Sequence, residues 1–124
     1  FVGDEISIRR KIGVEYNNGI NNAFIRKAKV EDYNSHSFHI YPILTDYRDE
    51  LREYLRDRDI ETLIHYPIPP HKQSCYPEYN HLKIPVCEYI HKSELSLPIS
   101  SILSPENVTY IIETINEWTP KELK

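Results

Sequence analysis

The segment IHYPIPPH, residues 64–71, concentrates side chains that could take part in chemistry. His65 and His71 carry imidazoles and Tyr66 carries a phenol, so each can donate or accept a hydrogen bond, and an imidazole can also act as a base near neutral pH. The three prolines of the segment fix the backbone, so these groups would be presented in set positions. The alternative interpretation, which the pattern alone favours slightly, is that the prolines only route the chain while Tyr66 packs into the core.

Metal sites are not indicated by the remaining histidines and cysteines. His36 and His39 are three residues apart in a predicted strand, where they would point to opposite faces of a sheet. No HExxH motif occurs, and Cys75 and Cys87 lack CxxC spacing. We therefore assign no metal ligand.

Phosphate-binding and hydrolase motifs are also missing from the sequence. It contains no GxGxxG, GxxxxGK[ST] or GxSxG pattern, and only three glycines are present. No catalytic residue is assigned on this basis, and the segment 64–71 stays the main candidate.

The elements that would position this segment are two predicted strands and the helix between them. Residues 37–44, SFHIYPIL, predict a strand, and Pro42 places it at an edge of the sheet or at a bulge. A helix is predicted over 46–58, where Leu51, Tyr54 and Leu55 fall on one face. Asp59 follows in the position that favours a left-handed backbone, and a second strand is predicted over 60–66. The candidate segment then hangs on the end of this second strand.

Helices and short extended segments account for the rest of the chain. Apolar residues recur every four positions over 4–20, the stripe of an amphipathic helix that ends near Gly19. Pro85 can begin a short helix that runs to Ser93, and Ser104 caps a closing helix over 105–118. Short strands are predicted over 23–28 and 95–98, and residues 119–124 are expected to form a loose tail.

Length and composition limit the classes of protein to consider. The 124 residues fit one domain with one core. A net charge of −4 gives no basic surface for nucleic acid or anionic lipid, so neither is expected as a partner. No apolar run is long enough to span a membrane and no signal peptide is evident, so we expect a soluble, cytoplasmic protein. Because the chain has no methionine and begins with Phe1, we expect it to be a fragment.

Three stretches of the sequence closely resemble the C-terminal region of the DegT/DnrJ/EryC/StrS aminotransferases, which act on nucleotide-linked keto sugars. These stretches are RRKIGVEYNNGI, then SFHIYP followed by YRDELREYLRDRDIETLIHYPIPPHKQSCY, and finally IPVCEYIHKSELSLPISSILSPENVTYIIETIN. The similarity covers residues 9 to 118, and IHYPIPPHKQ and LSLPIS are its most specific parts. The form HYPIPPHKQ is most similar to the subgroup that makes 3-amino-3,6-dideoxyhexoses on dTDP carriers.

The resemblance implies part of a fold-type I enzyme that uses pyridoxal phosphate and glutamate as the amino donor, in deoxyaminosugar or lipopolysaccharide biosynthesis. It implies a homodimer with active sites at the subunit interface. In this family the lysine that binds the cofactor covalently lies in a large N-terminal domain that this chain lacks. None of the eight lysines sits in the corresponding motif, so the chain alone should not transaminate and its cofactor-binding residues are unknown.

The resemblance also suggests roles for individual residues. His65, Tyr66 and His71 match positions that border the cleft and approach the sugar nucleotide, so they are the predicted substrate-binding residues. His39 matches a recurrent histidine whose role we expect to be structural. Asp59 stands where the family usually has glycine, and Gly13 stands where it usually has alanine.

We therefore expect an α/β fold, an α-β sandwich like the small domain of fold-type I aminotransferases. A small, mostly antiparallel sheet would carry helices 46–58 and 105–118 on one face. Residues 4–118 would form this C-terminal small domain, with 4–20 as the connector helix to the missing domain. A non-enzymatic binding or regulatory module derived from the family is the alternative.

Overall fold

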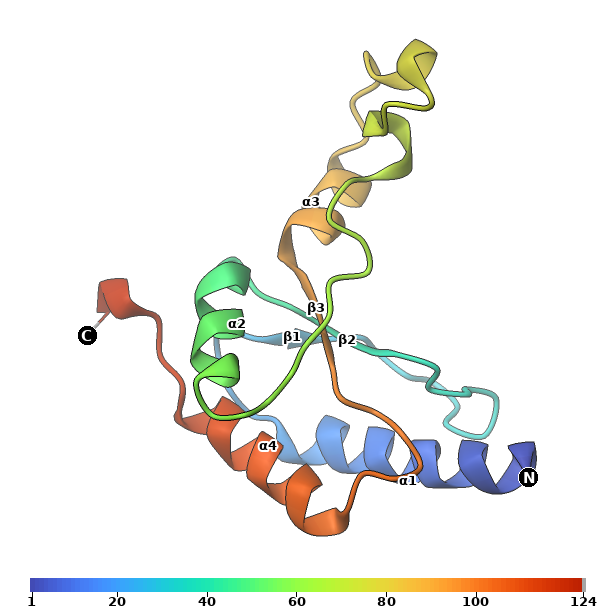
Figure 1. Ribbon diagram of the computed structural model, residues 1–124, viewed down its shortest axis with the longest axis vertical. Coiled ribbons are helices and arrows are strands. Elements are labelled where there is room, and N and C mark those ends of the chain that lie inside the picture. The colour runs from blue at the N-terminus through green and yellow to red at the C-terminus, as the bar shows by residue number, and fades with distance from the viewer. Residues whose placement is uncertain (124) are drawn as a thin grey trace.

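The computed structural model describes residues 1–123, which form four α-helices and a three-stranded antiparallel sheet (Figure 1). The helices are α1 (Val2–Gly19), α2 (Arg48–Arg56), α3 (Pro85–Ser93) and α4 (Pro105–Glu117). The strands are β1 (Arg26–Lys27), β2 (Tyr41–Leu44) and β3 (Glu94–Leu97), in the order β1-β2-β3. The α/β fold with a small antiparallel sheet is confirmed.

The two longer strands, β2 and β3, each have two different faces, because successive side chains of a strand point in opposite directions. Tyr41 pairs with Leu97 and Ile43 with Leu95, and these four side chains belong to the hydrophobic core. The intervening positions of β3, Glu94 and Ser96, are buried but polar. The sheet therefore has one apolar face toward the core and one face that carries buried polar groups.

Helices α1, α2 and α4 supply the other side of the core. α1 contributes Ile12 and Tyr16 to the core. The helix predicted to be a connector is therefore also part of the packed body. α2 contributes Leu51 and Leu55, as its apolar spacing predicted. α4 contributes Val108, Ile111 and Ile115.

Two local features confirm the sequence analysis, and a third, at Gly13, was not predicted. The Ser104 side chain accepts a hydrogen bond from the backbone N–H of Asn107 and so caps α4. Asp59 has a φ of 59°, the left-handed conformation predicted after α2. At Gly13 an added Cβ would lie only 2.7 Å from the ring of Phe38, so the glycine makes room for that buried ring.

The predicted strand over 60–66 is wrong. Only Leu63 pairs with β3: its N–H donates to the carbonyl of Ser96 and its carbonyl accepts from the Ser96 N–H. Two residues later the N–H of His65 donates to the side chain of Glu94 rather than to a strand carbonyl. A carboxylate thus takes the place of the next ladder partner and ends the pairing.

The first predicted strand is also shorter and lies elsewhere in the sheet than expected. It begins only at Tyr41, because Phe38 has a φ of 48° and its N–H donates to the ring of His36. Pro42 lies in the central strand rather than at an edge. It is tolerated there because β1 pairs only with Ile43 and Leu44, so at Pro42 the strand has one neighbour.

Residues 66–92, which we call the arm, extend away from the body in Figure 1. The arm contains two short 3₁₀ helices, η1 (Pro70–Lys72) and η2 (Pro77–Tyr79), and most of α3. It leads from the Leu63 bridge out into η1 and returns through α3 to β3. The candidate segment 64–71 therefore spans the junction between body and arm.

The chain after α4 is more ordered than the predicted loose tail. Pro120 is fully buried, and the N–H of Lys121 donates to Glu50 of α2 at 2.7 Å. A third short 3₁₀ helix, η3, covers Lys121–Leu123, and Lys124 lies outside the described residues. No helix within residues 1–123 has both the length and the apolar character needed to cross a membrane.

Candidate functional site

His65 is held at the junction by a buried carboxylate and a buried hydroxyl. Its backbone N–H donates to Glu94 Oε2 at 2.7 Å, and its ring Nδ1 lies 2.9 Å from Ser96 Oγ. The Ser96 hydroxyl in turn donates to Glu94 Oε1. Glu94 and Ser96 are 3% and 4% exposed, so neither can turn toward solvent. Both the main chain and the ring of His65 are therefore fixed by β3.

A surface pocket opens beside this group. Leu63, His65 and Ser96 contribute from the junction and β3, and the carboxylate-bearing Glu61 lies on the same stretch of chain as Leu63. The other lining residues are His39, Ile40, Leu97, Pro98 and Ile99. The pocket thus combines apolar walls with a few polar groups, the usual make-up of a small-molecule site.

One wall of the pocket is held by Arg9 of α1. Its Nη1 donates to the carbonyl of His39 at 3.2 Å and to that of Ile99 at 3.1 Å. One guanidinium therefore joins two segments of the pocket wall that are distant in sequence, those that carry His39 and Ile99. His39, expected to be structural, lies in the pocket wall.

Tyr66 follows His65 and is 65% exposed, so its phenol is not a core group. Its ring lies edge-on to the His65 ring, with 5.3 Å between the ring centroids. Its carbonyl is hydrogen-bonded to the ring Nδ1 of His91 on α3. The exposed phenol removes the interpretation in which Tyr66 packs into the core.

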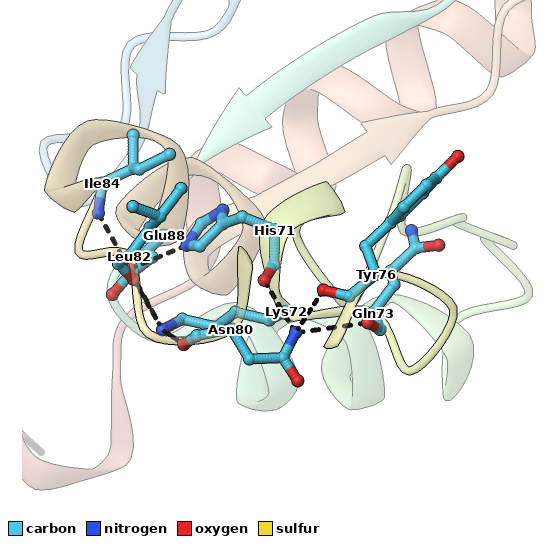
Figure 2. A network of polar contacts seen from close by, with 8 residues as sticks. All are labelled: His71, Lys72, Gln73, Tyr76, Asn80, Leu82, Ile84 and Glu88. Carbon is cyan, nitrogen blue, oxygen red and sulfur yellow. Dashed lines mark hydrogen bonds and ion pairs between the residues drawn. The ribbon is translucent and has the colours of Figure 1, made fainter. Parts of the chain in front are cut away.

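His71 lies within the arm and is only 6% exposed (Figure 2). Its Nε2 lies 2.9 Å from Glu88 Oε1, and the same oxygen accepts the backbone N–H of Ile84. These contacts, first that of Ile84 and then that of His71, hold the pKa of the Glu88 carboxyl below its ordinary value. The structure therefore keeps His65 and Tyr66 adjacent and places His71 in the interior of the arm.

Lysine and amide side chains stabilise the same part of the arm. Lys72 Nζ donates to the carbonyls of Asn80 and Leu82, both at 2.8 Å. Asn80 donates from its amide nitrogen to the carbonyls of His71, Gln73 and Tyr76, as Figure 2 shows. The turns of the arm are thus held by side chains in place of regular secondary structure.

Glu94 and Ser96 are the site residues that the sequence analysis missed. The signal was the alternation ELSL at residues 94–97, which places two polar side chains on one face of a strand. A glutamate inside a fully buried strand needs hydrogen-bond partners, and that need points to a polar site.

Pyridoxal phosphate, which the family resemblance implies, does not fit the residues described here. It requires a lysine that can bond to it, and no lysine lines the pocket beside His65. Lys27 and Lys72, for example, are each committed to backbone carbonyls. Within residues 1–123 there is also no group of three or more acidic, histidine or cysteine side chains that could hold a metal ion.

Comparison with known families gives a match over nearly the whole chain. The model of the DegT/DnrJ/EryC1/StrS aminotransferase family matches residues 2–116.

Curated relatives are much longer than this chain. The dTDP-3-amino-3,6-dideoxy-alpha-D-galactopyranose transaminase of Aneurinibacillus thermoaerophilus is 38% identical over 95% of the chain and 32% of its own length. The GDP-perosamine synthase of Escherichia coli O157:H7 is 35% identical over 93% of the chain and 32% of its own length. The chain therefore spans about a third of the curated relatives that it matches.

Solved structures agree with this assignment. The crystal structure of Streptomyces venezuelae DesV, in complex with a ketimine intermediate, superposes with a TM-score of 0.85 at 29% identity. The superposition covers 92% of this chain and 32% of the DesV chain. A DegT/DnrJ/EryC1/StrS aminotransferase from Brucella abortus superposes with a TM-score of 0.81, also at 29% identity, over 90% of this chain and 30% of its own.

Proposed function

The chain belongs to the DegT/DnrJ/EryC1/StrS aminotransferase family, and from this premise we propose that it is the C-terminal small domain of a longer nucleotide-sugar aminotransferase. The small domain would be residues 4–118, with 4–20 as its connector helix. The full protein would use pyridoxal phosphate to move an amino group from glutamate to a nucleotide-linked keto sugar. The observation that carries this proposal is 38% identity to a sugar transaminase over 95% of the chain.

The role of this chain within that enzyme would be to orient the substrate. The cofactor supplies the amino-transfer chemistry and would be held by the part of the protein outside this chain, since the lysines described here do not fit it. His65 lines the pocket at the base of the arm, whereas the exposed Tyr66 lines a different pocket together with Pro67 and Ile68. Both side chains can hydrogen-bond a polar ligand. We assign His71 to holding the arm in shape, so any effect on substrate would be indirect.

We further propose that the full protein acts in the cytoplasm as a homodimer, in deoxyaminosugar or lipopolysaccharide biosynthesis. The names of several relatives support a nucleotide-sugar substrate: they include dTDP-, GDP- and UDP-linked sugars. The base and the sugar differ among these relatives, so the proposal names only the class.

A non-enzymatic regulator is the second candidate, and one comparison favours it. The pleiotropic regulatory protein of Geobacillus stearothermophilus is 33% identical over 89% of this chain and 31% of its own length. Such a protein could use the same fold to bind a ligand without amino transfer.

One experiment separates the two candidates. The full-length protein is purified with pyridoxal phosphate, mixed with glutamate and supplied with dTDP-, UDP- or GDP-linked keto hexoses. Release of 2-oxoglutarate with one of these sugars is the expected result. No release with any of them, together with an upstream sequence that lacks a cofactor-binding lysine, would favour the regulator. The 124-residue chain alone should form no single-site covalent adduct with pyridoxal phosphate.

A further inference from the structure

The hydrogen bonds between β3 and His65 determine which ring nitrogen carries the proton. Ser96 has one hydroxyl proton, and it is donated to Glu94 Oε1. Toward His65, 2.9 Å away, the Ser96 oxygen can therefore only accept. The Nδ1 of His65 must then carry a proton and donate it to Ser96.

Glu94 fixes this direction. Its Oε1 accepts from Ser96 and its Oε2 accepts from the His65 N–H at 2.7 Å, so both oxygens act as acceptors. Glu94 and Ser96 lie two residues apart on one face of β3, and both are more than nine-tenths buried. Because the two side chains are buried, a water molecule could change which group donates and which accepts only by displacing one of them.

The other ring nitrogen, Nε2, is left for a ligand. None of the hydrogen bonds within residues 1–123 involves Nε2, and His65 lines the pocket. In a neutral imidazole with a proton on Nδ1, Nε2 is an acceptor with a lone pair. The ligand group that meets it must therefore be a donor.

The charge of the pocket points in the same direction. Its lining includes the carboxylate of Glu61 and contains neither lysine nor arginine. Arg9 approaches two lining residues, but its Nη1 is already bonded to their carbonyls. Apart from the His39 imidazole in the pocket wall, a diphosphate would meet an acceptor nitrogen and a negative side chain here, whereas a hydroxyl would meet acceptors to which it can donate.

We infer that the pocket formed by His65, Ser96 and Glu61 takes the hydroxyl-bearing sugar of the ligand and not its diphosphate, with His65 Nε2 as the hydrogen-bond acceptor. Glu94 and Ser96 are then positioning residues that set the tautomer of His65. This inference rests on the proposed function, since it assigns a part of the proposed nucleotide-sugar substrate to one pocket.

A nucleophilic serine is the other chemistry that a carboxylate, a hydroxyl and an imidazole suggest. In a serine hydrolase the imidazole lies between carboxylate and hydroxyl, and the hydroxyl faces the substrate. Here the hydroxyl lies between the other two groups and is 4% exposed, with its proton directed to Glu94. The order of the three groups therefore supports a positioning chain and not a nucleophile.

The first test uses binding to the full-length protein. Titration calorimetry compares dTDP-, UDP- and GDP-glucose with the corresponding free nucleoside diphosphates. We expect His65→Ala to weaken binding of the preferred nucleotide sugar about 10-fold, the effect of one lost hydrogen bond, and to leave the free diphosphate within about 2-fold. His65→Gln, whose side-chain oxygen can accept in place of Nε2, should recover part of the loss. The exposed His81→Ala serves as the control.

Equal weakening of the nucleotide sugar and the free diphosphate by His65→Ala would overturn the inference while leaving the proposed function in place. Failure of the wild-type protein to bind any of the nucleotide sugars would overturn both. The two proposals are therefore separable in one set of titrations.

The second test reads the tautomer without a ligand. In full-length protein labelled with ¹⁵N at histidine, the His65 signals are assigned by their loss in His65→Gln. We expect a protonated Nδ1 and a bare Nε2 near neutral pH, and we expect Ser96→Ala to mix the two tautomers. A protonated Nε2 with a bare Nδ1 in the wild-type protein would overturn the inference even if the binding results agreed with it.

Discussion

The Nε2 of His71 lies 2.9 Å from Glu88 Oε1 and joins the outgoing and returning halves of the arm. His71 belongs to η1 and Glu88 to α3, seventeen residues later. The arm has no strand, and its outgoing half contains only short 3₁₀ helices, so a buried contact between its two sides should matter for its shape.

His71→Ala should loosen the arm without unfolding the body. The change removes a buried ring and its hydrogen bond to Glu88, a local loss of about 1–3 kcal/mol. Hydrogen exchange of the full-length protein should show faster exchange over residues 69–84 and unchanged exchange in α4. Uniformly faster exchange would show instead that His71 supports the whole fold.

The same substitution tests the predicted role of His71 in substrate binding. If His71 only shapes the arm, His71→Ala should impair sugar-nucleotide use no more than Asn80→Ala, which removes three hydrogen bonds from the same turns. A clearly larger loss for His71→Ala, with equal arm exchange rates in the two variants, would support direct contact with the substrate.

Acid should loosen the arm through Glu88. The pKa of its carboxyl is lowered in the folded state from an ordinary value of 4.5, chiefly by the Ile84 N–H and next by His71. A lowered pKa means that the stabilising contribution is present above pH 4.5 and is lost as pH falls through the folded value. The protection factors over residues 69–84, which compare the observed exchange with the intrinsic exchange at the same pH, should fall in the wild-type protein as pH is lowered from 6. Glu88→Gln should already exchange quickly at pH 6 and show a weaker pH dependence.

Local features of this chain could be predicted from its sequence, whereas the long-range pairings could not. The Ser104 cap and the left-handed Asp59 depend on neighbouring residues, and both were predicted correctly. The strand expected over 60–66 failed because Glu94, about thirty residues later, accepts the N–H that a fourth strand would have used. No local pattern contains that partner.

In the candidate site, too, the sequence predicted some of the residues and could not predict others. The sequence singled out His65 and Tyr66 from the stiff segment, and the structure places their rings side by side, with His65 lining the pocket. The stiff segment and the family resemblance also grouped His71 with them, whereas the structure buries the His71 side chain in the arm. The groups that set the chemistry of His65 come from β3, which only the tertiary fold brings near.

Gly13→Ala should destabilise the protein although alanine favours helices. The new methyl group would lie 2.7 Å from the buried ring of Phe38, and overpacking of this kind costs about 1–3 kcal/mol. Gly3→Ala in the same helix is the matched control, because nothing lies within 4 Å of its added Cβ. Chemical denaturation should show a lower free energy of unfolding for Gly13→Ala. For Gly3→Ala the free energy of unfolding should stay the same or rise by up to about 1 kcal/mol. Equal stability of the two variants would mean that Phe38 is not held against α1.

Alkaline pH should destabilise the core through Tyr16 and Tyr41. Burial is the main cause that raises the pKa of both phenols above the ordinary value of 10. A raised folded pKa means that the unfolded chain loses these protons first, so the stability is full below pH 10 and falls as pH rises above it. Tyr41→Phe removes one of the two phenols and should make the decline above pH 10 less steep. At pH 7 this substitution should lower the free energy of unfolding by about 1 kcal/mol, because it removes the hydrogen bond that the Tyr41 hydroxyl donates to Asn17 at 2.7 Å.

Tyr16→Phe should act on the pocket as well as on stability. The Tyr16 hydroxyl donates to the carbonyl of Pro98 at 2.7 Å, and Pro98 lines the pocket beside His65. Its removal leaves a part-buried carbonyl without its donor, at a cost of about 1–3 kcal/mol, and frees the Pro98 segment to shift. We expect a lower unfolding midpoint at pH 7 and weaker nucleotide-sugar binding by the full-length protein, whereas Tyr41→Phe should lower the midpoint alone. Weaker binding in both variants would mean that the loss follows from general destabilisation and that Tyr16 has no particular link to the pocket.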